Sequence, residues 1–117
     1  MREKSYVRSA ETYKKMKNWL KAGNIYVVAA DRINRADYSI PSFSVASEMY
    51  QKAKDYARAA QVSEEIYKKY PQDKRTPQAL YNAGLIYEKG KLYSDAIRCY
   101  KMLAEKFASS EYAEEGY

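Results

Sequence analysis

The chain has 117 residues, a length that suits one domain, with 46% hydrophobic residues and a net charge of +6. Four glycines, three prolines and few runs of Val, Ile and Thr favour an all-helical fold over β-sheets. With no histidine and one cysteine, Cys99, the chain lacks an internal disulfide, a His/Cys metal site and a thiol–histidine pair. We therefore expect no metal and no cofactor, and we expect Cys99 to be a small, half-buried residue.

Apolar residues recur at spacings of three and four along six segments, which is the period of an amphipathic helix. We expect helices over about 5–16, 19–34, 41–53, 56–70, 77–89 and 93–107. Asn18 and Asp55 stand where the second and fourth helices begin, and Thr76-Pro77 reads as an N-cap followed by proline in the first turn. No stretch reaches the roughly 20 apolar residues that span a bilayer.

The six segments form three pairs, because residues of one type return every 37 positions. The columns include small residues at 10, 47 and 84, large apolar residues at 6, 43 and 80, and aromatic residues at 19, 56 and 93. Two columns are invariant: Tyr13, Tyr50 and Tyr87; Ala22, Ala59 and Ala96. We predict a single array over 1–117, with repeats of about 3–39, 40–76 and 77–113. A partial capping helix over 111–117 would start a fourth unit, so we expect the chain to be a fragment of a longer protein.

Small residues let two helices approach closely, and Ala83-Gly84 and Ala96 lie where the third pair would close. The 14 tyrosines suit a thin, half-exposed core, although a bias of the source organism would also produce them. Because one hairpin cannot bury its apolar face alone, neighbouring hairpins must stack.

The segment Leu80 to Tyr87, followed by Tyr93-Ser94-Asp95-Ala96-Ile97 and Tyr100, resembles the tetratricopeptide repeat (TPR) family. The resemblance implies an all-α superhelix of three TPR-like hairpins. The usual unit has 34 residues, and the three extra ones fall around Gln72 to Arg75. The junctions at 69–73 and 106–113 resemble a bacterial cell-envelope subgroup, of the Tol–Pal coordinator and outer-membrane assembly lipoprotein type. This implies a bacterial origin and favours the periplasm slightly over the cytoplasm.

In such an array the first helix of each hairpin is expected to line the concave side. Its groove-facing residues should lie opposite the small columns. The candidate partner-binding residues are Lys4, Arg8, Glu11, Lys15, Ser44, Glu48, Gln51, Lys52, Gln78, Tyr81, Asn82, Leu85 and Lys89. The functional interpretation is a groove that binds a protein or peptide, and the alternative is plain solvated helix surface.

The positive charge is concentrated in the first hairpin. Residues 1–35 contain nine Lys/Arg and three acids, whereas residues 36–117 contain twelve of each. A basic end can attract an acidic protein partner. The alternatives are a solvated face or a contact with a preceding domain, and nucleic acid is disfavoured because no RNA or DNA module is recognisable.

The sequence contains no glycine-rich phosphate loop, nucleophile elbow or metal spacing. Glu64 and Glu65 are adjacent and are expected on different helix faces, so they do not form a carboxylate pair, and we interpret them as solubilising acids. We therefore predict a non-catalytic protein-interaction scaffold, with envelope assembly as a candidate process. The alternative is a structural spacer, or a segment that self-associates through an open edge around Leu103, Phe107 and Tyr117.

Overall fold

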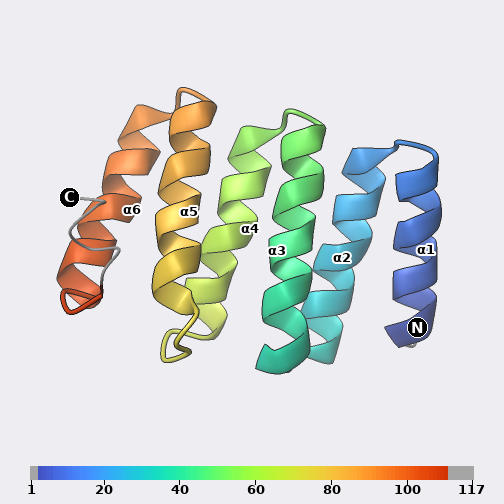
Figure 1. The fold of residues 1–117 in the computed structure, drawn as a ribbon, viewed down its shortest axis with the longest axis horizontal. Coiled ribbons are helices and arrows are strands. Elements are labelled where there is room, and N and C mark those ends of the chain that lie inside the picture. The colour runs from blue at the N-terminus through green and yellow to red at the C-terminus, as the bar shows by residue number, and fades with distance from the viewer. Residues whose placement is uncertain (1–2, 111–117) are drawn as a thin grey trace.

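The structure is a computed structural model in which residues 3–110 are described. Six α-helices and no strand occupy this part of the chain, which confirms the predicted all-α class. Consecutive helices form three antiparallel hairpins (Figure 1), and the second helices begin at Trp19, Tyr56 and Tyr93, each 37 residues after the last. The bounds are α1 (Glu3–Lys15), α2 (Trp19–Ile33), α3 (Ala36–Lys52), α4 (Tyr56–Lys69), α5 (Thr76–Lys89) and α6 (Tyr93–Lys106).

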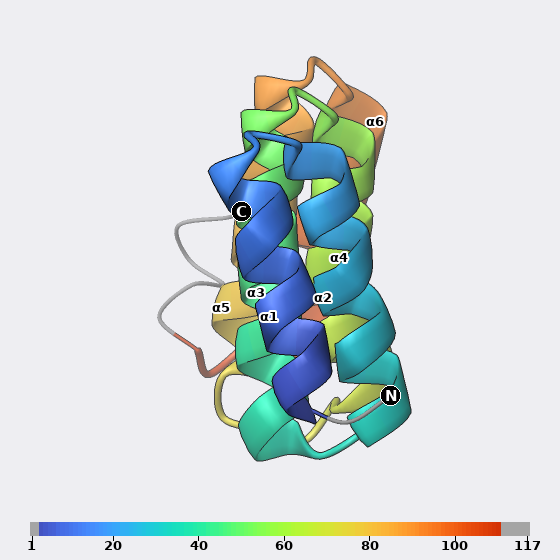
Figure 2. The same ribbon diagram turned by 90° about the vertical axis from the view of Figure 1, so that its right-hand side faces the viewer.

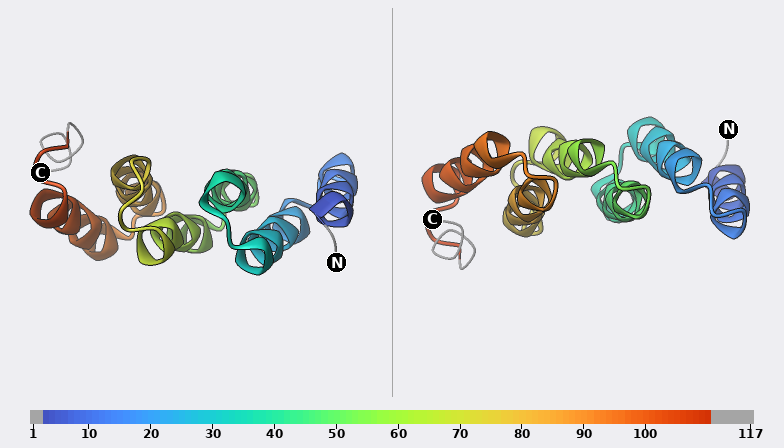
Figure 3. Two further views of the ribbon diagram at one scale, coloured as in Figure 1. Left: turned by 90° about the horizontal axis from the view of Figure 1, so that it is seen from below. Right: turned by 90° about the horizontal axis from the view of Figure 1, so that it is seen from above.

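The hairpins stack side by side into a two-layered array that measures 39 × 29 × 16 Å. Figure 3 shows α1, α3 and α5 in one layer and α2, α4 and α6 in the other. The turns within hairpins, at 16–18, 53–55 and 90–92, all lie at one end of the array, which we call the turn end (Figures 1 and 2). The connections between hairpins, at 34–35 and 70–75, lie at the opposite end, the junction end.

The core runs between the two layers and consists of the repeated apolar columns. Phe43, Ile66, Leu80 and Leu103 are almost completely buried. The helices approach closely where the sequence has small residues, because a side chain at Gly84 would collide with the ring of Tyr100. These contacts fit the close approach expected at the small columns.

Two of the predicted helix starts are confirmed by their capping hydrogen bonds. The side-chain oxygen of Asn18 accepts the Lys21 N–H at 3.3 Å, and that of Asp55 accepts the Arg58 N–H at 3.1 Å. The prediction that Thr76 is an N-cap is wrong, since α5 begins at Thr76 itself. Its hydroxyl instead donates to the carbonyl oxygen of Tyr70 and closes the junction loop.

The predicted start of α3 at about residue 41 is also wrong, because the helix begins at Ala36 and contains Pro41. A proline in that place removes one backbone hydrogen bond. The early start is stabilised by buried Ser39, whose hydroxyl donates to the Ala30 carbonyl at 2.7 Å and accepts the Arg35 N–H at 3.1 Å. The hydrogen bond from Ser39 to α2 thus outweighs the tendency of Pro41 to start a new helix. The capping helix predicted over 111–117 lies outside the described residues.

Candidate functional site

A hollow of about 370 Å³ lies between α3 and α5, with α4 as its floor. A smaller hollow of about 170 Å³ continues from it past Gln78 to Arg75, near the junction end. Lys89, the last residue of α5, lines the larger hollow at the opposite end of that helix. We call the two together the α3/α5 groove. The larger hollow is lined by Ser44, Ser47, Gln51, Ser63, Ile66, Ala79, Asn82, Leu85, Ile86 and Lys89.

The groove combines an apolar floor with a polar rim. Ile66 in the floor is 1% exposed, and Leu85 on the rim is 43% exposed. The hydroxyl of Ser47 is already engaged, since it donates to the Ala59 carbonyl at 2.9 Å. The side-chain amides of Gln51 and Asn82, in contrast, make no hydrogen bond within residues 3–110. The groove can therefore hold an apolar side chain and bond to the backbone of an extended segment.

The structure brings six of the predicted groove residues together and leaves the others apart. Those that line the groove are Ser44, Gln51, Gln78, Asn82, Leu85 and Lys89. The remainder line neither hollow: Lys4, Arg8, Glu11, Lys15, Glu48, Lys52 and Tyr81. Lys52 places its ammonium 4.7 Å from the centre of the Trp19 ring, and Tyr81 packs against Tyr100 of α6. Partner binding by any of these residues stays a prediction.

Sequence reasoning missed a buried polar network where α4, α5 and α6 meet. Glu64 of α4 is only 6% exposed, so its prediction as a solubilising acid is wrong. Its carboxylate accepts a hydrogen bond from the Tyr87 hydroxyl at 2.8 Å, one from the Cys99 thiol at 3.2 Å, and a forked contact from Arg98. Cys99 is completely buried, not half-buried as expected. The repeat aligns Glu64 with apolar Val27 but also with exposed Lys101, so the column carried no clear signal of burial.

The network fixes the protonation of its members. Burial raises the pKa of Glu64, but the hydrogen bonds from Arg98, Tyr87 and Cys99 outweigh it and leave that pKa below 4.5. Burial, followed by the neighbouring Glu64 carboxylate, raises the pKa of the Cys99 thiol well above its usual range. A protonated, buried thiol is a poor nucleophile, so the network is a structural link between hairpins.

Within residues 3–110, no three His, Cys, Asp or Glu side chains gather in a way that could hold a metal ion. None of the helices in that range has the length and apolarity needed to cross a membrane.

Comparison with known proteins identifies the family. No curated protein matches the chain. A family model described as soluble NSF attachment protein, SNAP, matches residues 3–116. This family consists of non-enzymatic helical-repeat adaptors that bind protein partners. The match supports a TPR-like helical repeat and gives no support to the bacterial cell-envelope subgroup. Since it covers all six helices, the chain belongs to the soluble NSF attachment protein family.

Proposed function

We propose that this chain is a non-catalytic adaptor that binds a segment of a protein partner in the α3/α5 groove. The observation that carries the proposal is the pairing of an apolar floor at Ile66 with two rim amides, Gln51 and Asn82, that have no partner within residues 3–110. The non-enzymatic adaptor character of the family supports it. The name of the family makes NSF the first partner to test.

The test uses two substitutions at matched exposure. Leu85 in the groove is 43% exposed, and Val28, on α2 in the other layer, is 40% exposed. We expect Leu85→Arg to weaken NSF binding about tenfold or more, as loss of a well-placed interface contact does, and Val28→Arg to leave it nearly unchanged. Biolayer interferometry with the immobilised chain measures the affinity of each variant for NSF. Equal binding by the two variants would remove the groove from the proposal.

A second candidate function is self-association through the outer face of α6. Tyr93 and Ile97 there are 58% and 52% exposed. One repeat earlier, Ala60 in the column of Ile97 is completely buried. Of the open edge predicted around Leu103, Phe107 and Tyr117, Leu103 is buried, Phe107 packs on Tyr67 at 5.9 Å between ring centres, and Tyr117 lies outside the described residues.

Sedimentation over a range of concentrations tests this second candidate. A dimer that Ile97→Asp dissociates would support self-association, since a buried charge opposes an apolar interface. A monomer at every concentration would exclude it.

A further inference from the structure

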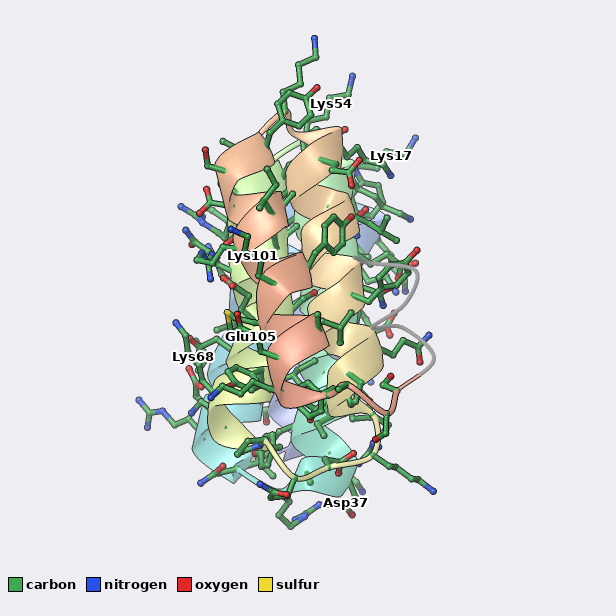
Figure 4. The ribbon with its side chains drawn as sticks, turned by 90° about the vertical axis from the view of Figure 1, so that its left-hand side faces the viewer. Lys17, Asp37, Lys54, Lys68, Lys101 and Glu105 are labelled. Carbon is green, nitrogen blue, oxygen red and sulfur yellow. The ribbon has the colours of Figure 1, made fainter. Side chains whose placement is uncertain are left out.

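In the third hairpin a tyrosine of the second helix covers part of the first helix. A side-chain carbon added at Gly84 of α5 would collide with the ring of Tyr100 on α6. The Tyr100 hydroxyl donates to Glu88 at 2.6 Å, and the centre of its ring is 6.1 Å from that of Tyr81. Figure 4 looks onto α5 and α6 from this end of the array, and Lys101, the next residue, lies on the side of α6 away from α5. Three residues of α5 thus hold the Tyr100 side chain.

The same column of the repeat holds a serine in the second hairpin. Ser63, on α4, stands 37 residues before Tyr100, and Tyr26, on α2, stands 37 residues before Ser63. Tyr26 is partly buried against the core. Burial, then the Glu11 carboxylate of α1 and Tyr38 of α3, raise the pKa of Tyr26, so its hydroxyl lies near both of those helices. The first and third hairpins therefore place a tyrosine of their own here, whereas Ser63 lines the larger hollow of the α3/α5 groove.

The residues of α3 that border this hollow correspond to the residues of α5 that hold Tyr100. The three equivalent positions, each 37 residues earlier, are occupied by Ser44, Ser47 and Gln51. All three line the larger hollow together with Ser63. Gln51 takes the place of Glu88, the acceptor of the Tyr100 hydroxyl, and its amide makes no hydrogen bond within residues 3–110. The hollow therefore has the wall of a tyrosine site without the tyrosine.

The two serines at the bottom of the hollow are satisfied by the chain itself. The Ser63 hydroxyl donates to that of Ser47 at 3.3 Å, and the Ser47 hydroxyl donates to the Ala59 carbonyl at 2.9 Å. Both residues are buried, so a ring can lie over them without leaving a polar group unpaired. The polar group of the hollow that still lacks a bond on this side is the Gln51 amide, where the hydroxyl of a tyrosine would end.

The charge of the hollow favours a neutral side chain as its occupant. Among the described residues that line the larger hollow, Lys89 alone is charged, and it is the last residue of α5. Ile66 and Ile86, which are 1% and 7% exposed, make part of the lining apolar. A glutamate or arginine placed over them would leave water without a partner of opposite charge, which is costly. A tyrosine has an apolar ring for this lining and a neutral polar tip for the amide.

We propose that the partner segment held in the α3/α5 groove inserts a tyrosine side chain over Ser47 and Ser63, with its hydroxyl donating to the amide oxygen of Gln51. The partner thereby supplies the ring that the first and third hairpins carry themselves. The proposal rests on the proposed function, since the groove places the segment. Tyrosine suits such a place because its rigid ring gives a large contact area for little loss of side-chain entropy.

The test uses three fluorescent peptides that differ at one position. Each is a short neutral peptide of serine, threonine and glycine, with tyrosine, phenylalanine or leucine at its centre. Fluorescence anisotropy measures the affinity of each peptide for the whole chain. We expect the tyrosine peptide to bind about fivefold more tightly than the phenylalanine peptide, as one neutral hydrogen bond contributes, and about tenfold more tightly than the leucine peptide. Equal affinities for the three peptides, or no binding by any of them, would overturn the proposal.

Two substitutions of glutamine test the contact with the hydroxyl. Gln51→Leu should lower the affinity for the tyrosine peptide about fivefold and leave that for the phenylalanine peptide unchanged, because only the tyrosine loses a hydrogen bond. The control is Gln61→Leu, a glutamine of α4 that lines a hollow on the other side of the array, and it should change neither affinity. Equal losses for the two peptides in Gln51→Leu, or none, would overturn the proposed contact.

A second variant fills the hollow with a ring of the chain's own. Ser47→Gly together with Ser63→Tyr recreates the Gly84–Tyr100 pair, and it should weaken the tyrosine peptide about tenfold or more. Ser94→Tyr, an exposed position on α6, is the control and should bind the peptide normally. Thermal melting followed by circular dichroism verifies folding, and normal binding by a folded double variant would overturn the proposal. If the double variant does not fold, the Gln51→Leu comparison decides.

Leu85→Arg separates this proposal from the groove itself. If it weakens NSF binding while the three peptides bind the wild-type chain alike, the groove stands and the tyrosine is refuted. If Leu85→Arg leaves NSF binding unchanged while Gln51→Leu still weakens the tyrosine peptide selectively, the tyrosine site stands and the groove fails as the place where NSF binds.

Discussion

The two interfaces between hairpins use the same repeat columns in different ways. Where α3 meets α2, the Tyr50 ring lies so close to Gly23 that an added side-chain carbon would be 2.8 Å from it. The Tyr50 hydroxyl donates to Asn24 at 2.5 Å. Where α5 meets α4, Tyr87 in the same column donates to buried Glu64 instead. One interface is apolar with a polar edge, and the other has a carboxylate in its interior.

The difference shows what a buried acid requires in a repeat fold. Glu64 occupies the column of Val27, and an unpaired carboxylate in that place would be costly. Its further donors, Arg98 and Cys99, come from α6. The network is therefore complete only when the third hairpin has docked on the second.

The largest effect should come from removing the arginine of the network. We expect Arg98→Met to lower the free energy of unfolding by about 2 kcal/mol, because a carboxylate that is 7% exposed loses its cationic partner. The value allows for the 46% exposure of Arg98. Urea denaturation measures it. Asn24→Leu at the first interface is the control and should cost less than about 0.5 kcal/mol. Equal losses would abolish the contrast between the interfaces.

A smaller effect should follow from filling the glycine of the first interface. An unhindered Gly→Ala change inside a helix stabilises by about 1 kcal/mol. At Gly23 the Tyr50 ring must shift, so we expect a net loss of about 1 kcal/mol. The same change in a Tyr50→Leu background should be neutral or stabilising. A gain in the wild-type background would show that the ring moves freely.

Making the second interface resemble the first should change stability by less than about 1 kcal/mol. The triple variant Glu64→Val, Tyr87→Phe and Arg98→Leu removes the carboxylate together with its main donors, and such replacements are often neutral or stabilising. The comparison is with Arg98→Met alone, in the same urea experiment. A loss in the triple variant as large as in the single one would mean that the network contributes net stability.

The smallest effect concerns pH. The pKa of Glu64 is lower in the folded chain than its ordinary value of 4.5, through Arg98, Tyr87 and Cys99 acting against burial. The ionised carboxylate therefore stabilises the fold above about pH 4.5, and this contribution is lost as the pH falls through the folded pKa. The stability advantage of the wild type over Glu64→Gln should shrink with acidification below that point. A stability advantage that is constant between neutral and acid pH would contradict the lowered pKa of Glu64.

Local sequence patterns were sufficient to predict the six helices but not the position of every helix end. The 37-residue period predicted three hairpins, and the caps at Asn18 and Asp55 are where the pattern placed them. The start of α3 was missed because buried Ser39 anchors it to α2, a contact between residues nine positions apart. Of the 13 candidate groove residues, six line the groove. The seven others lie outside it; Lys52 and Tyr81 do so because they contact Trp19 of α2 and Tyr100 of α6.

By itself the sequence determined the all-α array and its period, because helix faces depend on residues a few positions apart. Only the tertiary structure decided that Glu64 and Cys99 are buried and which six of the candidate groove residues lie together. The physical reason is that burial of a charge depends on donors supplied by other helices. Those donors come together only after the hairpins have stacked.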